Sequence, residues 1–454
     1  MARIEKDLLG TLEIDDDVLY GIHSLRANHN FPITKRGLDS LFIKNIALVK
    51  KACAMVNKEN KDLGDEKADA IIKACDQIIA GEHLDAFIVD LIQGGAGTSA
   101  NMNANEVIAN LAIKHLGGKP GQYEIVNPID DVNMHQSTND VIPTAARLTV
   151  MDKANHLIDT LGYLKEELDK KAKQYENVYR LGRTQLQDAV PMKASRSFEA
   201  YSSMVKRAIV KIENVLKYMK HVNIGGTAIG SGITSNKYYQ EHIVERLSEL
   251  SGYELSQFYN LYDGTQNVDD FASVSAEIRV CALSLSKMAN DIILLTSGPF
   301  SGFGEYHIPD KQNGSSIMPG KVNPVIPETL NQSAYLVIGN DLTVMMAAQA
   351  GQFELNAYLP VLLFQLFESI DVLSNSVKTF VDNCLKDLVV NEEKCAYNVE
   401  HSASLATALI PIIGYEKASE IVKKAKKLNK TVFEIAEEYG ISRKDIEDRL
   451  NPLD

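Results

Sequence analysis

The chain has 454 residues, 45% of them hydrophobic and 24% charged, which is typical of a globular protein with a large core or about two to three domains. Its formal net charge of −13 argues against nonspecific binding of nucleic acids, because such binders concentrate lysine and arginine. Five widely spaced cysteines without a C-x-x-C pair argue against both a disulfide framework and a zinc site.

The N-terminal region, residues 1–140, has short helical patterns mixed with turns such as "GQYEIVNPIDD". Its first residues, "MARIEKDLLG", lack the basic start and apolar stretch of a signal peptide. The sequence also lacks any run of about 18 uncharged apolar residues, the length that a membrane helix needs. We therefore expect a cytoplasmic protein that has no contact with membranes.

Two polar stretches of this region carry many neutral hydrogen-bond donors, "GGAGTSANMNANE" (94–106) and "HQSTND" (135–140). Hydroxyl and amide groups can surround carboxylate oxygens without one counter-charge for each oxygen. Taken alone, either stretch is explained better by helix caps, whereas the four such stretches of the chain together are harder to explain in that way. The candidate ligands in them are Thr98, Ser99, Asn101, Ser137, Thr138 and Asn139.

The central region, residues 141–392, is dominated by apolar residues that recur at steps of three and four. This rhythm appears in 157–168, 201–219, 271–295 and 366–384. It predicts at least four long helices, each with one apolar face. We expect these helices to share a core and to form a long-helix bundle.

Two further polar stretches interrupt the central region, "GRTQLQD" (182–188) and "GSSIMPGKVNPVIPE" (314–328). The second holds a lysine among small, turn-forming residues. A unit positive charge about 4 Å from a carboxylate gains about 4 kcal/mol at an effective dielectric constant near 20. This lysine therefore fits a carboxylate site from which water is excluded, although a solvated surface lysine is the alternative. The candidates in these two stretches are Thr184, Gln185, Ser315, Ser316, Lys321 and Asn323.

The C-terminal region, residues 393–454, contains short amphipathic segments such as "VFEIAEEYG" and "SRKDIEDRL". No period of about 20 to 50 residues appears, so a solenoid is not expected. The sequence predicts a mainly all-α protein of three domains, 1–140, 141–392 and 393–454, of which the middle one is the long-helix bundle.

Several familiar site patterns are absent. The sequence contains no G-x-x-x-x-G-K-[ST], no H-E-x-x-H and no G-x-S-x-G. The histidines are scattered without ligand spacing, and only His135 and His307 lie beside the polar stretches. Nucleotide, zinc and esterase sites are therefore not expected, and no metal ligands are predicted.

The stretch "GSSIMPGKVNPVIPE" resembles the signature of the fumarase/aspartase superfamily, whose members cleave a C–N or C–O bond of a succinyl compound and release fumarate. The other three polar stretches resemble its conserved regions and follow in the same order. The likeness runs from "DLLGTLEI" to the C-terminal region. Within the superfamily, "GGAGTSANMNANEVIAN", "GRTQLQDAVPM" and "AGQFELN" are most similar to aspartate ammonia-lyases.

The resemblance implies a three-domain subunit and a homotetramer, whose core contains about twenty helices. It also implies active sites that are each assembled from three subunits. The substrate would be a small dicarboxylate and no cofactor would be required, with activation by a divalent metal left open. No nucleic-acid partner is expected.

The resemblance also implies roles for individual residues. Ser315 would be the base that takes a proton from the carbon beside a carboxylate, and Lys321 and Asn323 would hold a carboxylate. Backbone N–H groups of the glycine-flanked loop are the expected source of stabilisation for the serine alkoxide. The positions implied to bind the carboxylates and the amino group are Thr98, Ser137, Thr138, Asn139, Thr184 and Ser316.

Gln185 distinguishes between two reactions of the superfamily. Fumarases have a histidine there, paired with a glutamate that corresponds to Glu328. Glutamine does not titrate, whereas hydroxide is a poor leaving group that benefits from a proton donor. Gln185 therefore favours deamination of L-aspartate over hydration of fumarate, which is the alternative.

Some positions depart from the family pattern. "VPMKASRSFEA" has Lys193 where other members read more like T-L-G-Q, His135 replaces a small residue, and His307 lies near the catalytic stretch. A substituted aspartate is therefore a further candidate substrate. A catalytically silent protein on the same scaffold is a third hypothesis, against which Ser315, Lys321 and Asn323 argue.

Overall fold

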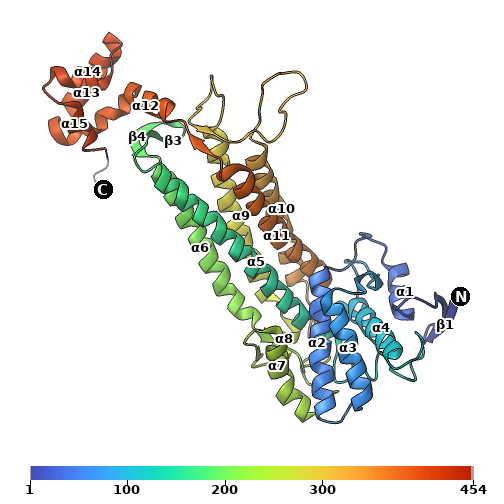
Figure 1. Cartoon of the computed structure of the whole chain (residues 1–454). Helices are drawn as coiled ribbons and strands as arrows, with labels where there is room; N and C mark the ends of the chain where they lie inside the picture. The colour runs from blue at the N-terminus through green and yellow to red at the C-terminus, as the bar shows by residue number, and fades with distance from the viewer. Residues whose placement is uncertain (1, 451–454) are drawn as a thin grey trace. The chain divides into compact units, whose positions relative to one another are not determined.

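Helices dominate the computed structural model, which describes residues 2–450 (Figure 1). Fifteen α-helices lie within this range, together with four two-stranded sheets. The prediction of a mainly α-helical protein is confirmed. The small sheets were not predicted.

The described residues divide into two compact units. The first unit comprises residues 2–158, 210–280 and 336–372, and the second comprises residues 159–209, 281–335 and 373–450. This division is discontinuous in sequence because the long helices contribute residues to both units. The three-domain boundaries near residues 140 and 392 stay predictions.

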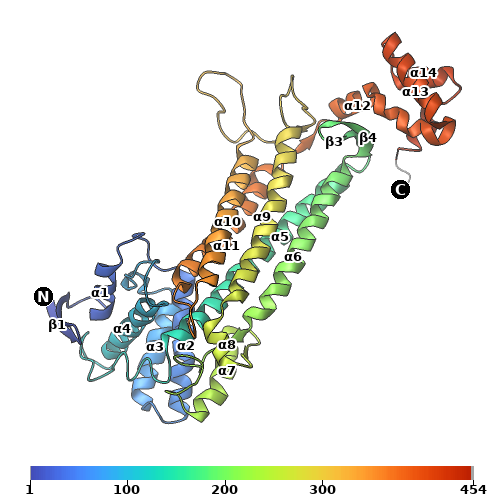
Figure 2. The same ribbon diagram turned by 180° about the vertical axis from the view of Figure 1, so that it is seen from behind.

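The first unit begins with a β-hairpin and a group of helices. In this group α2 packs against α3, and α3 packs against α4, as both views show (Figures 1 and 2). Asp39 caps α2 by accepting the N–H groups of Leu41 and Phe42. The elements are β1 (Ala2–Asp7), β2 (Gly10–Asp15), α1 (Ile22–Asn30), α2 (Ser40–Glu59), α3 (Asp65–Ala80), η1 (Leu84–Ala86) and α4 (Thr98–His115).

Further short elements of the first unit lie between residues 221 and 266. They are β5 (His221–Val222), α7 (Lys237–Ser251), β6 (Ser256–Gln257) and α8 (Leu261–Gln266). The strands β5 and β6 are parallel. Helix α7 packs against α2, which ties this segment to the N-terminal helices.

The described residues contain five long helices, and all of these except the one at residues 325–349 carry the apolar rhythm seen in the sequence. They are α5 (Thr138–Gln174), α6 (Ser195–Met219), α9 (Asp269–Leu295), α10 (Val325–Gln349) and α11 (Leu359–Phe380). In α9, every predicted apolar position from Phe271 to Leu295 is buried. In α6, Ala208 and Val215 are only half-buried, whereas the other predicted positions are buried. The period of the sequence therefore located the buried faces of these helices.

The second unit contains two antiparallel strand pairs and the C-terminal helices. The strands are β3 (Tyr179–Thr184) with β4 (Gln187–Lys193) and β7 (Tyr306–His307) with β8 (Val389–Val390). The helices are the π-helix η2 (Val381–Leu385), α12 (Glu392–His401), η3 (Ala403–Leu409), α13 (Ile410–Leu428), α14 (Val432–Glu438) and α15 (Arg443–Glu447).

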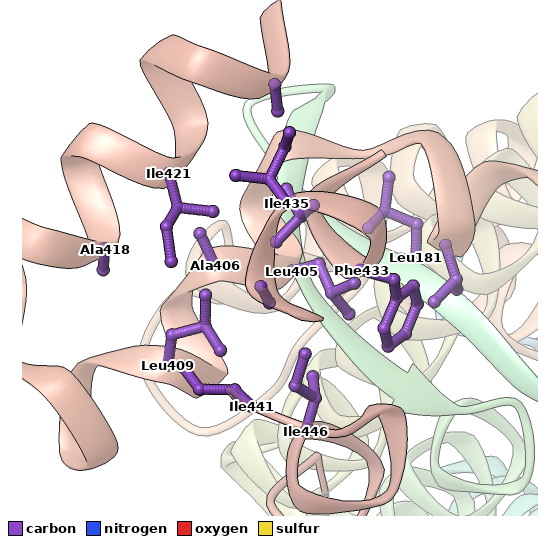
Figure 3. Packing of buried hydrophobic residues seen from close by; sticks show 14 residues of the cluster. Leu181, Leu405, Ala406, Leu409, Ala418, Ile421, Phe433, Ile435, Ile441 and Ile446 are labelled. Atoms are coloured by element: carbon purple, nitrogen blue, oxygen red, sulfur yellow. The ribbon is translucent and has the colours of Figure 1, made fainter. Parts of the chain in front are cut away.

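The C-terminal helices share a hydrophobic cluster with strand β3 (Figure 3). Leu405, Ile421 and Ile435 lie in this cluster and are fully buried. Leu181 of β3 contributes to the same cluster and is 2% exposed. The strand that leads to Thr184 and Gln185 is therefore anchored on the C-terminal helices.

Within residues 2–450, none of the helices is both long enough and apolar enough to cross a membrane. All five cysteines are buried and free.

Candidate active site

The predicted site residues fall into both units. The first unit contains Thr98, Ser99, Asn101, His135, Ser137, Thr138 and Asn139. The second unit contains Thr184, Gln185, His307, Ser315, Ser316, Lys321, Asn323 and Glu328. The roles assigned to these residues stay predictions, and each unit has its own geometry.

Thr98 begins helix α4 after a turn that requires glycine. Gly95 and Gly97 have φ angles of +85° and +95°, a region that side-chain-bearing residues rarely occupy. A Cβ atom at Gly97 would also lie 3.0 Å from a methyl carbon of Ile142. The Thr98 hydroxyl donates to the carbonyl of Gly95 at 2.7 Å. The hydroxyl of Thr98 is thus exposed at a helix start, with its backbone held in one conformation.

Asn101 and Thr138 lie next to each other in the first unit. Asn101 Nδ2 donates to Thr138 Oγ1 and to Asn133 Oδ1, both at 3.2 Å. Asn101 is 2% exposed, and its Oδ1 accepts no hydrogen bond from any described residue. A buried acceptor without a donor is unfavourable. This oxygen is fully buried and has no donor among the described residues.

Asp140 holds the start of α5 and was not predicted as part of the site. Its Oδ1 accepts the N–H of Ser137 at 2.9 Å, and its Oδ2 accepts the N–H groups of Gly225 and Thr227 at 3.2 and 2.9 Å. Burial raises the pKa of Asp140 to about 6, although these N–H groups favour its ionised form. The only signal in the sequence is the glycine-rich stretch from Asn223 onward, which indicates a loop but not its contact with a carboxylate.

His135 connects the loop of residues 135–140 to Asp62 and to the segment that contains Thr234 and Asn236. Its Nδ1 lies 2.9 Å from the carbonyl oxygen of Thr234, and its Nε2 lies 3.3 Å from Asp62 Oδ2 and 3.1 Å from Asn236 Nδ2. The ring also packs against Tyr239, with centroids 5.4 Å apart. Because both ring nitrogens contact the protein, His135 acts in this structure as a contact between loops.

The side chain of Asn139 also helps to hold the loop of residues 135–140 in place. Its Nδ2 donates to the carbonyl of Ala228 at 2.7 Å, and its N–H donates to Ser137 Oγ at 3.2 Å. The loop 135–140 is thus held from several sides by groups of the protein itself.

In the second unit, Thr184 and Gln185 lie at the tip of a β-hairpin. Thr184 pairs with Gln187, which leaves Gln185 and Leu186 as a two-residue turn with φ angles of +54° and +62°. Positive φ at both positions is the type I′ geometry, which normally requires Asn-Gly or a similar pair. Since "QL" gives no such signal, the sequence did not reveal this hairpin. Thr184 and Gln185 are both exposed.

Ser315 lies in a loop whose backbone donates to its hydroxyl. Ser315 Oγ accepts the N–H groups of Ile317 at 3.2 Å and Met318 at 3.0 Å. Two N–H donors on one oxygen favour that oxygen in its ionised form. The backbone donors that the sequence led us to expect around this serine are therefore present in the loop.

The ends of this loop are joined. Asn323 Nδ2 donates to the carbonyl of Gly314 at 2.8 Å. A Cβ atom at Gly314 would lie 2.1 Å from the carbonyl oxygen of Lys321. The approach of the two ends thus depends on glycine, and Ser316 and Lys321 are exposed on the loop between them.

The remaining candidates lie on neighbouring elements of the second unit. Glu328 is exposed in the first turn of α10. His307 is exposed on β7, opposite Val389 of β8. The correspondence of Glu328 to the glutamate of fumarases stays a prediction, and the sequence assigned no role to His307.

Comparisons with known proteins show which family the chain belongs to. The sequence model of the Lyase family matches residues 10–339, and that of the fumarase C C-terminus matches residues 405–454. The chain belongs to the fumarase/aspartase superfamily.

Individual members of the superfamily are similar over the whole chain. An aspartate ammonia-lyase from Bacillus sp. is 45% identical over 454 residues, which cover 100% of this chain and 97% of the relative. A solved fumarate lyase:delta crystallin from Brucella melitensis, bound to cobalt, is 44% identical with a TM-score of 0.96, covering 100% of this chain and 99% of the other. A class II fumarase from Schistosoma mansoni is 32% identical with a TM-score of 0.93, covering 100% and 98%.

The candidate residues do not include a cluster of metal ligands. Within residues 2–450, no group of three or more His, Cys, Asp or Glu side chains is arranged to hold a metal ion. The candidate site instead consists mainly of hydroxyl, amide and ammonium groups.

Proposed function

We propose that this protein is an aspartate ammonia-lyase, which cleaves L-aspartate to fumarate and ammonia. The observation that carries the proposal is the 45% identity to an aspartate ammonia-lyase over the whole chain. Identity to the class II fumarase is 32%, so fumarate hydration is the second candidate. Gln185 also favours deamination, because it cannot donate a proton to a departing hydroxide.

Ser315 is the proposed base. Its alkoxide takes the proton from the Cβ of aspartate, and the resulting charge spreads into the neighbouring carboxylate as an enediolate. The C–N bond then breaks, the electron pair leaves with the amine as ammonia, and a double bond forms between Cα and Cβ. The N–H groups of Ile317 and Met318 support the alkoxide.

The other candidate residues bind the substrate in this proposal. Lys321 and Asn323 hold one carboxylate, and hydroxyl and amide groups hold the second carboxylate and the amino group. Asn101, which donates to Thr138 Oγ1 in the same region, is proposed to help bind the substrate. The proposed binding residues, besides these, are Thr98, Ser99, Ser137, Thr138, Asn139, Thr184, Gln185 and Ser316.

We also propose a homotetramer whose active sites combine residues of three subunits. The support is the exposure of apolar side chains on α10 in the single chain. Leu336, Leu342, Met345 and Met346 are between 44% and 55% exposed. A row of exposed leucine and methionine side chains on one helix is typical of an interface.

The reaction proposed here uses no cofactor, and a cytoplasmic location in amino-acid metabolism is proposed with it. The five unpaired, buried cysteines suit a reducing compartment.

The test is an assay of the purified protein for fumarate and ammonia, with L-aspartate, L-malate and substituted aspartates as substrates. Each substrate is assayed with Mg²⁺ and with a chelator, which measures any activation by metal. Turnover of aspartate with equal amounts of fumarate and ammonia is expected. Turnover of malate alone would overturn the proposal in favour of the fumarase.

Ser315→Ala should lower turnover of aspartate by several orders of magnitude while the melting temperature changes little. Ser316→Ala provides the comparison, because loss of one donor to the developing oxyanion typically lowers turnover by about 10²-fold. Near-normal turnover in Ser315→Ala would assign the base to another residue.

A further inference from the structure

A buried ion cluster in the second unit links the hairpin tip to the segment before the Ser315 loop. The Glu305 side chain is fully buried. Its Oε1 accepts from Arg183 Nη2 at 2.6 Å and from Asn398 Nδ2 at 2.9 Å, and its Oε2 accepts from Arg180 Nε at 3.2 Å. One carboxylate thus joins β3, α12 and the segment that leads into β7.

Glu305 is held as a carboxylate. Burial by itself raises the pKa of such a group, but the hydrogen bond from Arg183 and the charges of Arg180 and Arg183 outweigh burial and lower it. A buried carboxylate persists only with partners of this kind, and removing one partner leaves a charge uncompensated. Glu305 therefore ties both arginines to one buried point.

The two arginines reach the same carboxylate although they are three residues apart on β3. Residues three apart in a regular strand point to opposite faces of the sheet. The pairing of β3 with β4 shifts between Leu181 and Arg183, where Ala189 and Val190 of β4 lie opposite Gly182 alone, so the strand pair is bulged beside the two arginines. A Cβ atom at Gly182 would lie 2.7 Å from the carbonyl oxygen of Val190, so the close approach of β3 to the bulged β4 requires glycine.

Glu305 is itself fixed by its backbone. Its N–H donates to the carbonyl of Leu295 at 2.9 Å, and its carbonyl accepts the N–H of Asn391 at 2.8 Å. Arg183 in turn packs over the ring of Phe303, with the guanidinium carbon 4.5 Å from the ring centroid. Several contacts thus hold the hairpin at its base. Thr184 is the residue directly after Arg183.

We propose that Glu305 is a positioning residue for aspartate cleavage, which acts through Arg183 to fix Thr184 and Gln185 at the hairpin tip. Arg183 is the last residue before the two candidate ligands, and the turn that follows it has a sparsely populated backbone conformation. Without the contact to Glu305, the tip would lose its orientation. This inference rests on the proposed function.

The test is a double-mutant cycle between Glu305→Gln and Gln185→Ala, measured as kcat/KM for L-aspartate. Gln185→Ala alone should lower kcat/KM by about 10²-fold. Glu305→Gln alone should lower it by about 10- to 100-fold, since a misplacement of about 1 Å costs that much. In the Glu305→Gln background, Gln185→Ala should lower kcat/KM by less than about 10-fold, because the glutamine is then already displaced.

Asp382→Asn is the matched control. Asp382 is also a carboxylate of the second unit with several partners, Lys378, Lys386 and Tyr163, but none of these partners lies on β3. The effect of Asp382→Asn on kcat/KM should be the same in the wild type and in Gln185→Ala. A loss of stability common to both carboxylate variants would not produce coupling to Gln185 in only one of them.

Additive effects of Glu305→Gln and Gln185→Ala in a protein that melts normally would overturn the inference. If Glu305→Gln does not fold, the same cycle is measured with Arg183→Lys, which keeps the charge but not the planar contact to Glu305. Additive effects of Arg183→Lys and Gln185→Ala would then overturn the inference. Wild-type protein without activity on aspartate would instead overturn the proposed function.

Discussion

Asp140 is a buried carboxylate whose three N–H donors hold the loop that carries Ser137 and Thr138. Its pKa is raised to about 6 from the ordinary value of 3.8, with burial as the main cause. The folded protein therefore binds this proton more tightly than the unfolded chain between these two values. The free energy of unfolding should fall as the pH rises through that window, by about 3 kcal/mol for a shift of about two pKa units.

Asp140→Asn removes this titration and provides the test. The variant should be less stable than the wild type at a pH of about 4.5, because an amide replaces one acceptor oxygen. The gap in melting temperature should narrow as the pH rises to about 7.5, because only the wild type then carries a buried charge. A gap that stays constant over this range would show that Asp140 does not titrate there.

At the scale of residues, the sequence indicated which side chains could bind a dicarboxylate but not how the protein holds them. The glycine-flanked loop predicted N–H donors for Ser315, and two are present. Asp140 and Glu305 were not predicted, because most of their partners are distant in sequence. No local pattern reveals that Glu305 contacts Arg183.

At the scale of elements, helices were predictable and the hairpin was not. The three-and-four rhythm located the buried faces of α5, α9 and α11 because each is a long helix with one apolar side. Strands β3 and β4 are short, contain a bulge and turn at Gln185 and Leu186 without glycine or asparagine. Their sequence therefore lacks the usual signals of a hairpin.

The loop that contacts Asp140 contains a glycine, Gly230, whose replacement should destabilise the fold. Gly230 has a φ angle of +100°, and a Cβ atom there would lie 2.4 Å from the backbone nitrogen of Tyr262. Gly230→Ala should therefore lower the free energy of unfolding by more than the roughly 1 kcal/mol expected for backbone strain alone.

Gly252→Ala is the control for this prediction. Gly252 also has a positive φ, of +74°, but no other atom lies within 4 Å of the place that its added methyl group would occupy. Both variants are compared by thermal melting. Equal losses of stability would show that the close approach to Tyr262 is relieved by a small shift of the backbone.

At the scale of the whole molecule, the proposed tetramer with shared sites predicts complementation between inactive subunits. In the proposed site Ser315 of the second unit is the base and Thr138 of the first unit is a ligand, so Ser315→Ala and Thr138→Ala would each remove one of these groups. If each site takes these residues from different subunits, a mixed tetramer contains some sites with both residues intact. Unfolding and refolding the two variants together should then restore part of the wild-type turnover.

The controls for complementation are each variant refolded alone and the two variants mixed without unfolding. Both should stay at the low activity of the single variants. Sedimentation of the active mixture should show one species of about four subunits. Absence of any recovery in a mixture that forms tetramers would place both residues of a site on one subunit.

The joined ends of the Ser315 loop have a mechanical consequence. Because Asn323 bonds to Gly314, and glycine lets the chain close there, the residues between them form a ring of backbone rather than an open strand. Ser315 and Lys321 lie on that ring, so a displacement of the ring carries the proton acceptor and the ammonium group together. If Ser315 and Lys321 act as proposed, the base and the group that holds the carboxylate would therefore move relative to a substrate in a single step.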